Sequence, residues 1–351
     1  MNDWLPASEG FIFDLVTNLR RPGAVVALAS LLNTDRYPYG DVRSLHRLPR
    51  YVRPRRWQLP AMEAALELMA RRRRAAIVHV HHGYALDRVV GPARRRRLPV
   101  VLSLHGHDVT GYLEKRPDAY RQSLDVVSAV VVPSDFLVEY AERAGFDRDI
   151  IRVQPSGIDL SSFSPSPIPA GPPTALFVGR FVPKKGVDVL ARAWPAVQAR
   201  IPEARLVLCG FGQQEDLARS IPGNVTVLLS PDRNVVRSQM RNCRLVVSPS
   251  HAAPDDAMES LLVVNVEAQA SGRPVVTTRH GAIPEFVAEG RSALLVDEYD
   301  ADALAEAMVS VFEDDALARC MGAHGPQVVA QLDVRATAAR MDALYDEILA
   351  K

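Results

Sequence analysis

The strongest constraint on the fold of this chain is a repeated alternation of two kinds of segment. Short apolar runs of β-forming residues alternate with segments of helical periodicity along most of the sequence. This alternation is typical of βα units and parallel sheets, so we predict an α/β protein. The predicted strands are Ala24–Ala29, Ala76–Val80, Val100–Leu104 and Ala129–Val132, then Thr174–Val178, Arg205–Cys209, Val225–Leu229, Leu245–Ser248, Pro274–Thr277 and Ala293–Val296.

A segment rich in Pro and Ser interrupts the alternation once. Ser161–Pro173 reads SSFSPSPIPAGPP, which is typical of a linker. We therefore predict one domain over residues 1–165, a second over 166–330, and a C-terminal helix in 331–351 that packs back toward the first. The first 165 residues hold 24 Lys and Arg against 18 Asp and Glu, and the remainder hold 18 against 23. This asymmetry also favours two domains with different partners.

Composition limits the cellular compartments in which we expect this protein. No apolar run approaches the ~20 residues that span a bilayer, and no signal peptide opens the chain, so we expect a soluble or peripheral protein. Three scattered cysteines indicate neither a disulfide framework nor a zinc site, which favours the cytoplasm. The opening MNDWLPASEG offers no apolar strand before the helical pattern Phe11–Leu19. We expect that the first strand is absent or that the sequence starts late.

The stretch ESLLVVNVE places two carboxylates eight residues apart. On a continuous helix, Glu259 and Glu267 would lie about 12 Å apart along the axis and roughly 80° apart around it. That separation excludes a shared-proton dyad, whose carboxylates lie within about 5 to 9 Å. Two contacts on a long ligand would fit. The same pattern would fit an amphipathic helix in which Glu259 interacts favourably with the helix dipole and Glu267 is solvated.

Two loops that follow predicted strands could hold anions. In GRFVPKKG, Gly179 to Gly186, the cations Arg180 and Lys185 lie near a helix N-terminus, where a diphosphate could bind. The alternative is a solvated basic loop. In CGFGQQEDL, Gly210 and Gly212 form a Gly-x-Gly turn without the third glycine of a dinucleotide fingerprint, so a plain turn remains open.

The order of these motifs resembles a known family. GRFVPKKGVDVL, LVLCGFG, and ESLLVVNVE followed by AQASGRPVVTTRHGAIPE resemble the donor domain of retaining glycosyltransferases of family 4, which have the GT-B fold. SLHGHDVT in the first half is similar to the family's His-Gly-x-Asp loop, and PSGID to its hinge. The resemblance implies two Rossmann-like doubly wound domains that face a central cleft.

The resemblance also implies roles for individual residues. Arg180 and Lys185 would neutralise the diphosphate of a nucleotide-sugar, Glu259 would contact the donor sugar, and His105 would lie beside the transferred sugar. The implied catalytic set is His105, Arg180, Lys185 and Glu259. The implied donor-binding set is Gly179, Gly210, Gly212, Ser260, Leu261, Leu262 and Glu267, with Glu267 on the ribose. The candidates on the acceptor side are Ser8, Glu9, His82 and Asp108.

The implied reaction is transfer of a sugar from a UDP- or GDP-sugar to an acceptor hydroxyl with retention of configuration. We expect no metal and no cofactor, since Arg and Lys can stabilise the leaving diphosphate. Bacterial polysaccharide or glycoconjugate assembly is the family's usual setting. We expect no nucleic-acid partner. The acceptor could be lipid-linked, and the tetrads Arg71–Arg74 and Arg94–Arg97 could contact an anionic membrane from the cytoplasm or be solvated helix ends.

Two alternatives remain open, and departures from the family pattern suggest the second of them. Ser260 stands where the family usually has Gly after its first Glu, and Ala282 stands where a second Gly is common. One alternative is a GT-B nucleotide-sugar 2-epimerase, which would convert the donor without an acceptor. The other is a non-catalytic nucleotide-sugar-binding relative.

Overall fold

The computed structural model describes residues 10–21, 23, 25–27, 38–44, 55–253 and 258–351. The chain divides into two compact units. The first unit is Met1–Gly157 together with Val334–Lys351, and the second is Ile158–Asp333. The sequence placed the boundary at residue 165, inside the linker, whereas the structure assigns the linker to the second unit.

The second unit is built on a six-stranded parallel sheet in the order β12-β11-β10-β7-β8-β9. All six predicted strands are confirmed, and no predicted end differs from the structure by more than two residues. The strands are β7 Thr174–Arg180, β8 Arg205–Phe211, β9 Val225–Leu229, β10 Leu245–Ser248, β11 Val275–Thr278 and β12 Ala293–Val296. The helices are α6 Val187–Arg200, α7 Glu215–Ser220, α8 Arg233–Asn242, α9 Val263–Ala270, α10 Ala301–Glu313 and α11 Asp315–Val329.

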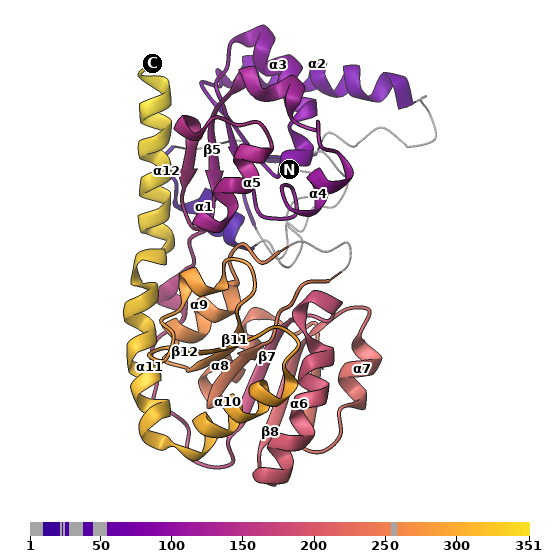
Figure 1. Cartoon of the computed structure of the whole chain (residues 1–351). Coiled ribbons are helices and arrows are strands. Elements are labelled where there is room, and N and C mark those ends of the chain that lie inside the picture. Colours follow the sequence, from indigo (N-terminus) through magenta and orange to yellow (C-terminus); the bar gives the residue numbers. More distant parts are fainter. Residues whose placement is uncertain (1–9, 22, 24, 28–37, 45–54, 254–257) are drawn as a thin grey trace. The chain divides into compact units, whose positions relative to one another are not determined.

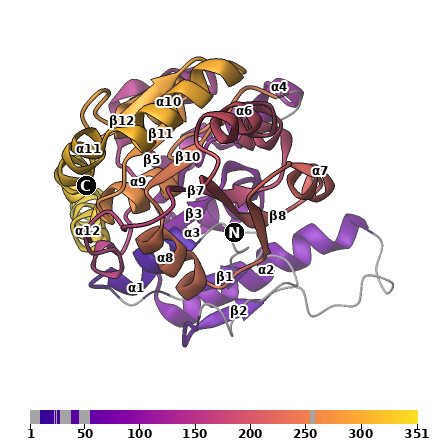
Figure 2. The same ribbon diagram turned by 90° about the horizontal axis from the view of Figure 1, so that it is seen from below.

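Helices cover both faces of this sheet, which explains why its central strands are apolar runs rather than alternating patterns. Helices α6 and α10 lie on one face, and α8 and α9 lie on the other (Figure 2). The first core includes Trp194, which is fully buried, and the second includes Met240 and Val246. This packing fixes the carboxyl ends of the strands, where functional loops of such sheets gather.

The first unit has a four-stranded parallel sheet in the order β3-β4-β5-β6 and a separate parallel pair, β1 and β2. The strands are β1 Val25–Ala27, β2 Val42–Ser44, β3 Val78–His81, β4 Val100–Ser103, β5 Val127–Val132 and β6 Ile151–Val153. The helices are α1 Gly10–Asn18, α2 Arg55–Arg73, α3 Asp87–Arg96, α4 Gly111–Lys115, α5 Val138–Arg143 and α12 Val334–Leu349. Strands β2 and β6 have three residues each and were not predicted.

The last helix, α12, belongs to the first unit although the second unit precedes it in the chain. Its residues Met341, Leu344 and Tyr345 share a buried cluster with Val101 and Val131 of the sheet. It also runs beside α1 (Figure 1). The first unit is therefore closed by residues from both ends of the chain.

Within the described parts of the chain, no helix combines the length and the apolar character that a bilayer-crossing segment needs.

Candidate functional site

The basic loop of the second unit starts where β7 ends, at Arg180. The Arg180 side chain is exposed, and its guanidinium forms no hydrogen bond or ion pair with the described residues. A short 3₁₀ turn, Pro183–Lys185, then leads to Gly186, whose φ of 73° starts α6. A Cβ atom at Gly186 would lie 1.9 Å from the carbonyl oxygen of Pro249, so only glycine lets the basic loop approach the loop after β10 this closely.

Close approach of these two loops creates a buried ion pair. The Lys185 Nζ donates to Glu259 Oε1 at 2.6 Å, and the Ser250 hydroxyl donates to the same oxygen at 3.2 Å. Burial alone would raise the pKa of Glu259, but the charges of Lys185 and Lys184 outweigh it and lower this pKa to about 2. Burial lowers the pKa of Lys185, against the opposing effect of Glu259. The sequence placed these two residues in one site, and the structure shows that they touch.

The expectation that Glu259 and Glu267 lie on one continuous helix is wrong. Helix α9 begins at Val263, so Glu259 lies ahead of it in irregular backbone. The cause is a competing hydrogen bond, because the Glu259 carbonyl accepts from the backbone N–H of Ala282 at 2.8 Å. Gly281, with a φ of 55°, packs so tightly on this stretch that a Cβ would lie 2.4 Å from the same carbonyl oxygen. The helical separation calculated for the two carboxylates therefore does not apply.

The other predicted donor-binding residues around Glu259 lie on both sides of this helix start. Ser260 and Leu261 are partly buried in the irregular stretch, and Leu262 is the buried N-cap residue of α9. Glu267 lies within α9 and is partly buried. Their proposed contacts with a donor remain predictions.

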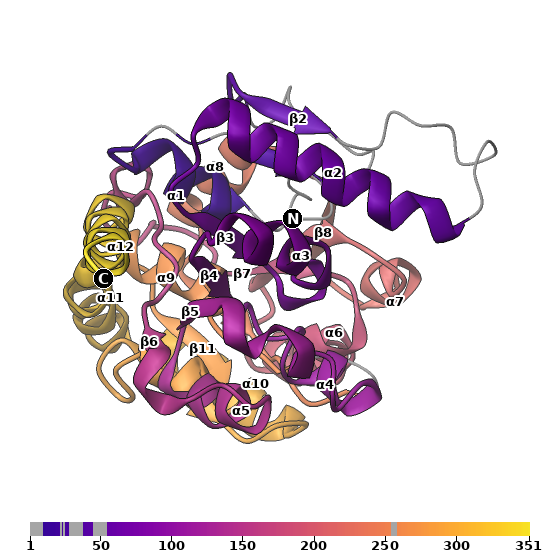
Figure 3. The same ribbon diagram turned by 90° about the horizontal axis from the view of Figure 1, so that it is seen from above.

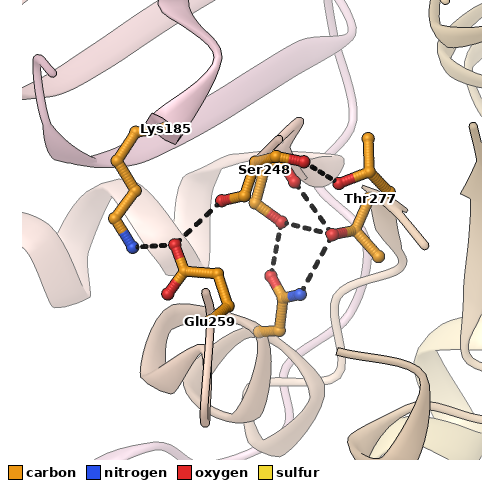
Figure 4. Close-up of polar contacts among 7 residues, drawn as sticks. Lys185, Ser248, Glu259 and Thr277 are labelled. Atoms are coloured by element: carbon orange, nitrogen blue, oxygen red, sulfur yellow. Dashed lines mark hydrogen bonds and ion pairs between the residues drawn. The ribbon is translucent and has the colours of Figure 1, made fainter. Parts of the chain in front are cut away.

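A polar network inside the sheet supports this stretch, and the sequence analysis did not find it. The Ser248 hydroxyl donates to Asn265 Oδ1 at 2.6 Å, Asn265 Nδ2 donates to Thr277 Oγ1 at 3.3 Å, and Thr277 Oγ1 donates to the Ser248 carbonyl at 2.8 Å (Figure 4). All three residues are buried. They tie the ends of β10 and β11 to the first turn of α9. The only sequence signal was an Asn inside the otherwise apolar run VVNV.

Two of the three predicted donor-site glycines, Gly210 and Gly212, have a packing role in the structure, whereas a Cβ at Gly179 would make only ordinary contacts, the nearest at 3.4 Å from Phe177. A Cβ at Gly210 would lie 1.9 Å from the carbonyl oxygen of Gly179 on the neighbouring strand. A Cβ at Gly212, whose φ is 148°, would lie 2.5 Å from the carbonyl oxygen of Phe181. These glycines therefore allow β7 and β8 to turn together at their carboxyl ends. Contact with a nucleotide stays a prediction.

A second set of polar contacts holds the other end of the Glu259 loop. His280 Nδ1 pairs with Glu298 Oε1 at 2.8 Å, and Glu298 Oε2 accepts from the backbone N–H of Ala252 at 2.7 Å. His251 Nε2 lies 3.1 Å from Asp188 Oδ1 on α6. His280 is 1% exposed, and its Nε2 has no hydrogen-bond partner among the described residues. These contacts tie His251 and Ala252 to α6 and to the loop after β11.

In the first unit, the predicted residues His105 and Asp108 share one loop after β4. The buried Asp108 accepts from the backbone N–H of His105 at 2.8 Å and from that of Gly83 at 3.1 Å. The Tyr120 hydroxyl donates to the Asp108 carbonyl at 2.6 Å. Asp108 thus joins the loops after β3 and β4. His82, the other candidate described here, lies 3.9 Å from Asp108 and has a positive φ of 70°.

His105 belongs to a cluster of imidazoles. Its Nε2 lies 3.2 Å from His81 Nδ1, and their rings are nearly parallel at 5.5 Å. Burial lowers the pKa of both well below the ordinary value, and neighbouring histidines lower it further, so both rings are neutral near pH 7. A third imidazole, that of His79, forms hydrogen bonds with the Tyr345 hydroxyl at 2.5 Å and with the Ser103 hydroxyl at 2.7 Å. The sequence predicted His105 but not its pairing.

The remaining candidates are Ser8 and Glu9, which lie outside the described residues. The tetrads occupy exposed ends of α2 and α3. Each of these two helix ends is followed in the chain by a strand, so the tetrads lie at the edge of the sheet where the strands begin. His105 lies at the opposite edge, where the strands end. Arg73, Arg94 and Arg95 are paired with carboxylates there. In the described part of the chain, no group of three or more His, Cys, Asp or Glu is placed to hold a metal ion.

Chemically, the second unit offers three charged groups at the carboxyl edge of its sheet: an ammonium, a carboxylate and a guanidinium that has no partner among the described residues. Cations at this edge suit an anionic ligand such as a diphosphate, and an ionised carboxylate can accept hydrogen bonds from hydroxyl groups. The first unit offers neutral imidazoles that can donate or accept a hydrogen bond but carry no charge.

Comparison with known proteins covers both units. Residues 172–314 match the family model described as glycosyl transferases group 1, and residues 8–162 match the model of glycosyltransferase family 4. The phosphatidyl-myo-inositol mannosyltransferase of Mycolicibacterium smegmatis is 32% identical over 55% of this chain, and the match spans 51% of that relative. The D-inositol 3-phosphate glycosyltransferase of Corynebacterium glutamicum is 27% identical over 98% of this chain and 89% of its own length.

The fold is also found in solved structures. Anabaena HepE, crystallised with UDP and glucose, superposes with a TM-score of 0.79 at 19% identity, covering 97% of this chain and 96% of its own. A sucrose-phosphate synthase from Thermosynechococcus elongatus gives a TM-score of 0.71 at 24% identity over 88% and 83% of the two chains. The predicted GT-B fold is confirmed.

Proposed function

Because this chain belongs to the family 4 glycosyltransferases, we propose that it transfers a hexosyl group from a UDP- or GDP-sugar to an acceptor hydroxyl with retention of configuration. The observation that carries the proposal is the buried Lys185–Glu259 ion pair together with the charge of Arg180, which forms no ion pair with the residues that the structure describes. These three charges converge at the strand ends where a doubly wound sheet binds its ligand.

Each of these residues would have a separate role in the reaction. Arg180 and Lys185 bind the donor diphosphate and stabilise the charge that grows on it as the bond from the anomeric carbon to the phosphate oxygen breaks. Glu259 orients the sugar through the carboxylate oxygen that Lys185 and Ser250 leave available. The acceptor oxygen attacks the same face of the anomeric carbon, and a donor phosphate oxygen takes its proton. His105 holds the transferred sugar as a neutral hydrogen-bonding partner.

The proposal also covers the need for a metal ion or a cofactor. We infer that the reaction needs neither metal nor cofactor, since Arg180 and Lys185 can stabilise the charge of the leaving diphosphate. A chelator should then leave the rate unchanged, and a loss of rate restored by Mg²⁺ would contradict this.

We also propose a cytoplasmic enzyme that works on a lipid-linked acceptor in glycoconjugate or polysaccharide assembly. Support comes from the relative named phosphatidyl-myo-inositol mannosyltransferase and from the exposed arginines at the ends of α2 and α3. Arginine clusters of this kind favour anionic lipid surfaces. Cosedimentation with vesicles containing anionic lipid, compared with neutral vesicles, tests the membrane contact. Equal recovery in the two would oppose it.

Replacement of Arg180 is the sharpest test of the donor site. The Arg180 guanidinium has no partner among the described residues, so Arg180→Ala should leave the melting temperature unchanged. The same substitution should weaken the binding of UDP or GDP about tenfold or more. Arg319→Ala is the matched control, because Arg319 is exposed on α11 and pairs only with the nearby Asp315 in the described residues. Titration calorimetry with UDP, GDP and their sugars measures the effect. Equal affinities in all three proteins would remove Arg180 from the site.

Product analysis separates the proposal from its alternatives. The anomeric proton coupling in the product reports whether configuration is retained. Conversion of the donor sugar without acceptor would indicate an epimerase. Nucleotide-sugar binding without turnover on any acceptor would indicate a non-catalytic relative.

A further inference from the structure

Strand β3 places two histidines on one face of the sheet of the first unit. Residues two apart in a strand point to the same side, so His79 and His81 share a face. The hydrogen bond between His79 and the Tyr345 hydroxyl shows that α12 covers this face, and α1 lies beside α12 (Figure 3). On the next strand, Ser103 pairs in register with His81, and His105 follows two residues later. The three imidazoles and the Ser103 hydroxyl form a polar column that ends at His105.

The layer around this polar column is apolar. Val101 and Val131 of the sheet share a buried cluster with Met341 and Leu344 of α12. Polar groups in such a layer cost free energy unless they are hydrogen-bonded. The imidazoles of the column find their partners in one another and in two hydroxyl groups, so each contact in it carries energetic weight.

One end of the polar column is anchored. Both ring nitrogens of His79 are hydrogen-bonded, one to the Tyr345 hydroxyl and one to the Ser103 hydroxyl, so the ring cannot rotate without breaking both bonds. The His81 ring stacks on it, with centroids 4.2 Å apart and planes 23° apart. The His81 ring in turn is nearly parallel to that of His105, with an interplanar angle of 9°. His81 therefore lies between an anchored ring and the ring proposed to hold the sugar.

The contact between His81 and His105 also constrains protons. His81 Nδ1 and His105 Nε2 lie 3.2 Å apart, and both rings are neutral near pH 7, so each carries one N–H. A hydrogen bond here needs one proton between the two nitrogens, because two lone pairs or two N–H groups would repel. If His81 donates, the proton of His105 is on Nδ1, and if His81 accepts, it is on Nε2. The tautomer of one ring therefore sets the tautomer of the other.

We propose that His81 is a positioning residue, which fixes both the orientation and the tautomer of the His105 ring. The inference rests on the proposed function, in which His105 holds the transferred sugar through a hydrogen bond. An imidazole without such a partner can turn over about its Cβ–Cγ bond and exchange its two nitrogens, so a sugar hydroxyl would meet a donor in some molecules and an acceptor in others. Held by His81, the ring offers one form only, so no reorganisation of the ring is needed during turnover.

NMR of the full-length chain, labelled in its histidine nitrogens, tests the link between the two rings without any turnover. The N–H nitrogen and the lone-pair nitrogen of a neutral imidazole have well-separated chemical shifts, whereas a mixture of tautomers averages them. The His105 signals are identified by their loss in His105→Asn. We expect a single tautomer of His105 in the wild type and a mixture in His81→Leu, which keeps a side chain of similar size but has no hydrogen-bonding group.

Turnover tests the consequence for the reaction, with the slow hydrolysis of a UDP- or GDP-sugar by water as the probe. His81→Leu should lower kcat about tenfold or more and change KM for the donor little, because the nucleotide would bind to the second unit. His81→Asn places an amide where Nδ1 lies, so it can still bond His105 and should recover most of the rate.

His79→Leu is the matched structural control. It removes the neighbouring imidazole from the same face of β3 and leaves the hydroxyls of Tyr345 and Ser103 without that partner, so it should lower the melting temperature as His81→Leu does. It should nevertheless retain the single tautomer of His105, because the bond from His81 remains.

Three results would overturn the proposal: a mixture of tautomers at His105 in the wild type, a single tautomer that persists in His81→Leu, or equal kcat in His81→Leu and His81→Asn. The wild-type spectrum requires no substitution at position 81, so it decides even if a variant fails to fold. Absence of hydrolysis with every nucleotide-sugar would contradict the proposed function instead, while the spectra would still decide whether His81 positions His105.

Discussion

At the scale of single residues, the contact between Glu259 and Lys185 bears on stability and on the proposed donor binding. Their ion pair is buried, and removing one partner of a buried pair leaves an uncompensated charge, which commonly costs about 3 to 5 kcal/mol. The same pair leaves one oxygen of Glu259 available for a ligand. We therefore expect both folding and donor binding to respond to this carboxylate.

The charge of Glu259 should make stability depend on pH. Its pKa falls from an ordinary 4.5 to about 2 in the folded protein, so its contribution is fully present above about pH 4.5 and is lost as the pH falls toward 2. Glu259→Gln should therefore be less stable than the wild type at pH 7, by on the order of 2–3 kcal/mol, and the difference should shrink at pH 3. Urea unfolding at both pH values measures this. A difference that is the same at both would contradict the assigned pKa.

Gly186 offers a second test at this scale. Gly186→Ala adds a Cβ against the Pro249 carbonyl and should destabilise the second unit by about 3 kcal/mol or more. Gly171→Ala is the matched control, because Gly171 also has a positive φ, 110°, but nothing lies within 4 Å of its added Cβ. It should cost only about 1 kcal/mol. Melting curves that shift equally in both variants would mean that the loop at Gly186 moves freely.

At the scale of elements, the Ser248–Asn265–Thr277 network joins two strands to one helix. Ser248→Ala and Asn265→Ala should each cost about 1 to 3 kcal/mol, because each leaves a buried partner unsatisfied. The double variant should cost less than the sum, with a coupling of about 1 kcal/mol. Urea unfolding of the four proteins completes the cycle. Additive effects would show that the two side chains act independently.

The elements also show what the sequence could and could not predict. The six strands of the second unit follow from apolar runs between turn residues, and they were located within two residues. The start of α9 was missed because Glu259 is held by a hydrogen bond from Ala282, which is 23 positions away in the chain. The pairing of His81 with His105 depends on the register of β3 and β4, which no local pattern specifies. Motif order predicted candidate site residues, but contacts between distant segments required the structure.

At the scale of the whole molecule, the two units should lose stability in different pH ranges. In the first unit, burial depresses the pKa of His79 to about 3 and lowers those of His81 and His105. Since the unfolded chain takes up protons near pH 6.5 while these folded rings stay neutral, stability falls as the pH drops from about 7 toward 4. In the second unit, the stabilising contribution of Glu259 is lost only as the pH falls below about 4.5.

Calorimetry at pH 7.5, 5.5 and 4.5 should therefore show one transition moving to lower temperature before the other. His79→Asn should reduce the shift of the first-unit transition, because it removes one of the three sites that gain protons on unfolding. Parallel shifts of both transitions, unchanged in this variant, would contradict the assignment.

The return of α12 to the first unit has a consequence for synthesis on the ribosome. The cluster that contains Val101 and Val131 needs Met341, Leu344 and Tyr345, which are translated after the second unit. The second unit, Ile158–Asp333, is complete before they emerge. Although domains are made from the N-terminus onward, the order of completion is reversed here: the first unit can close its core only after the whole second unit has been translated.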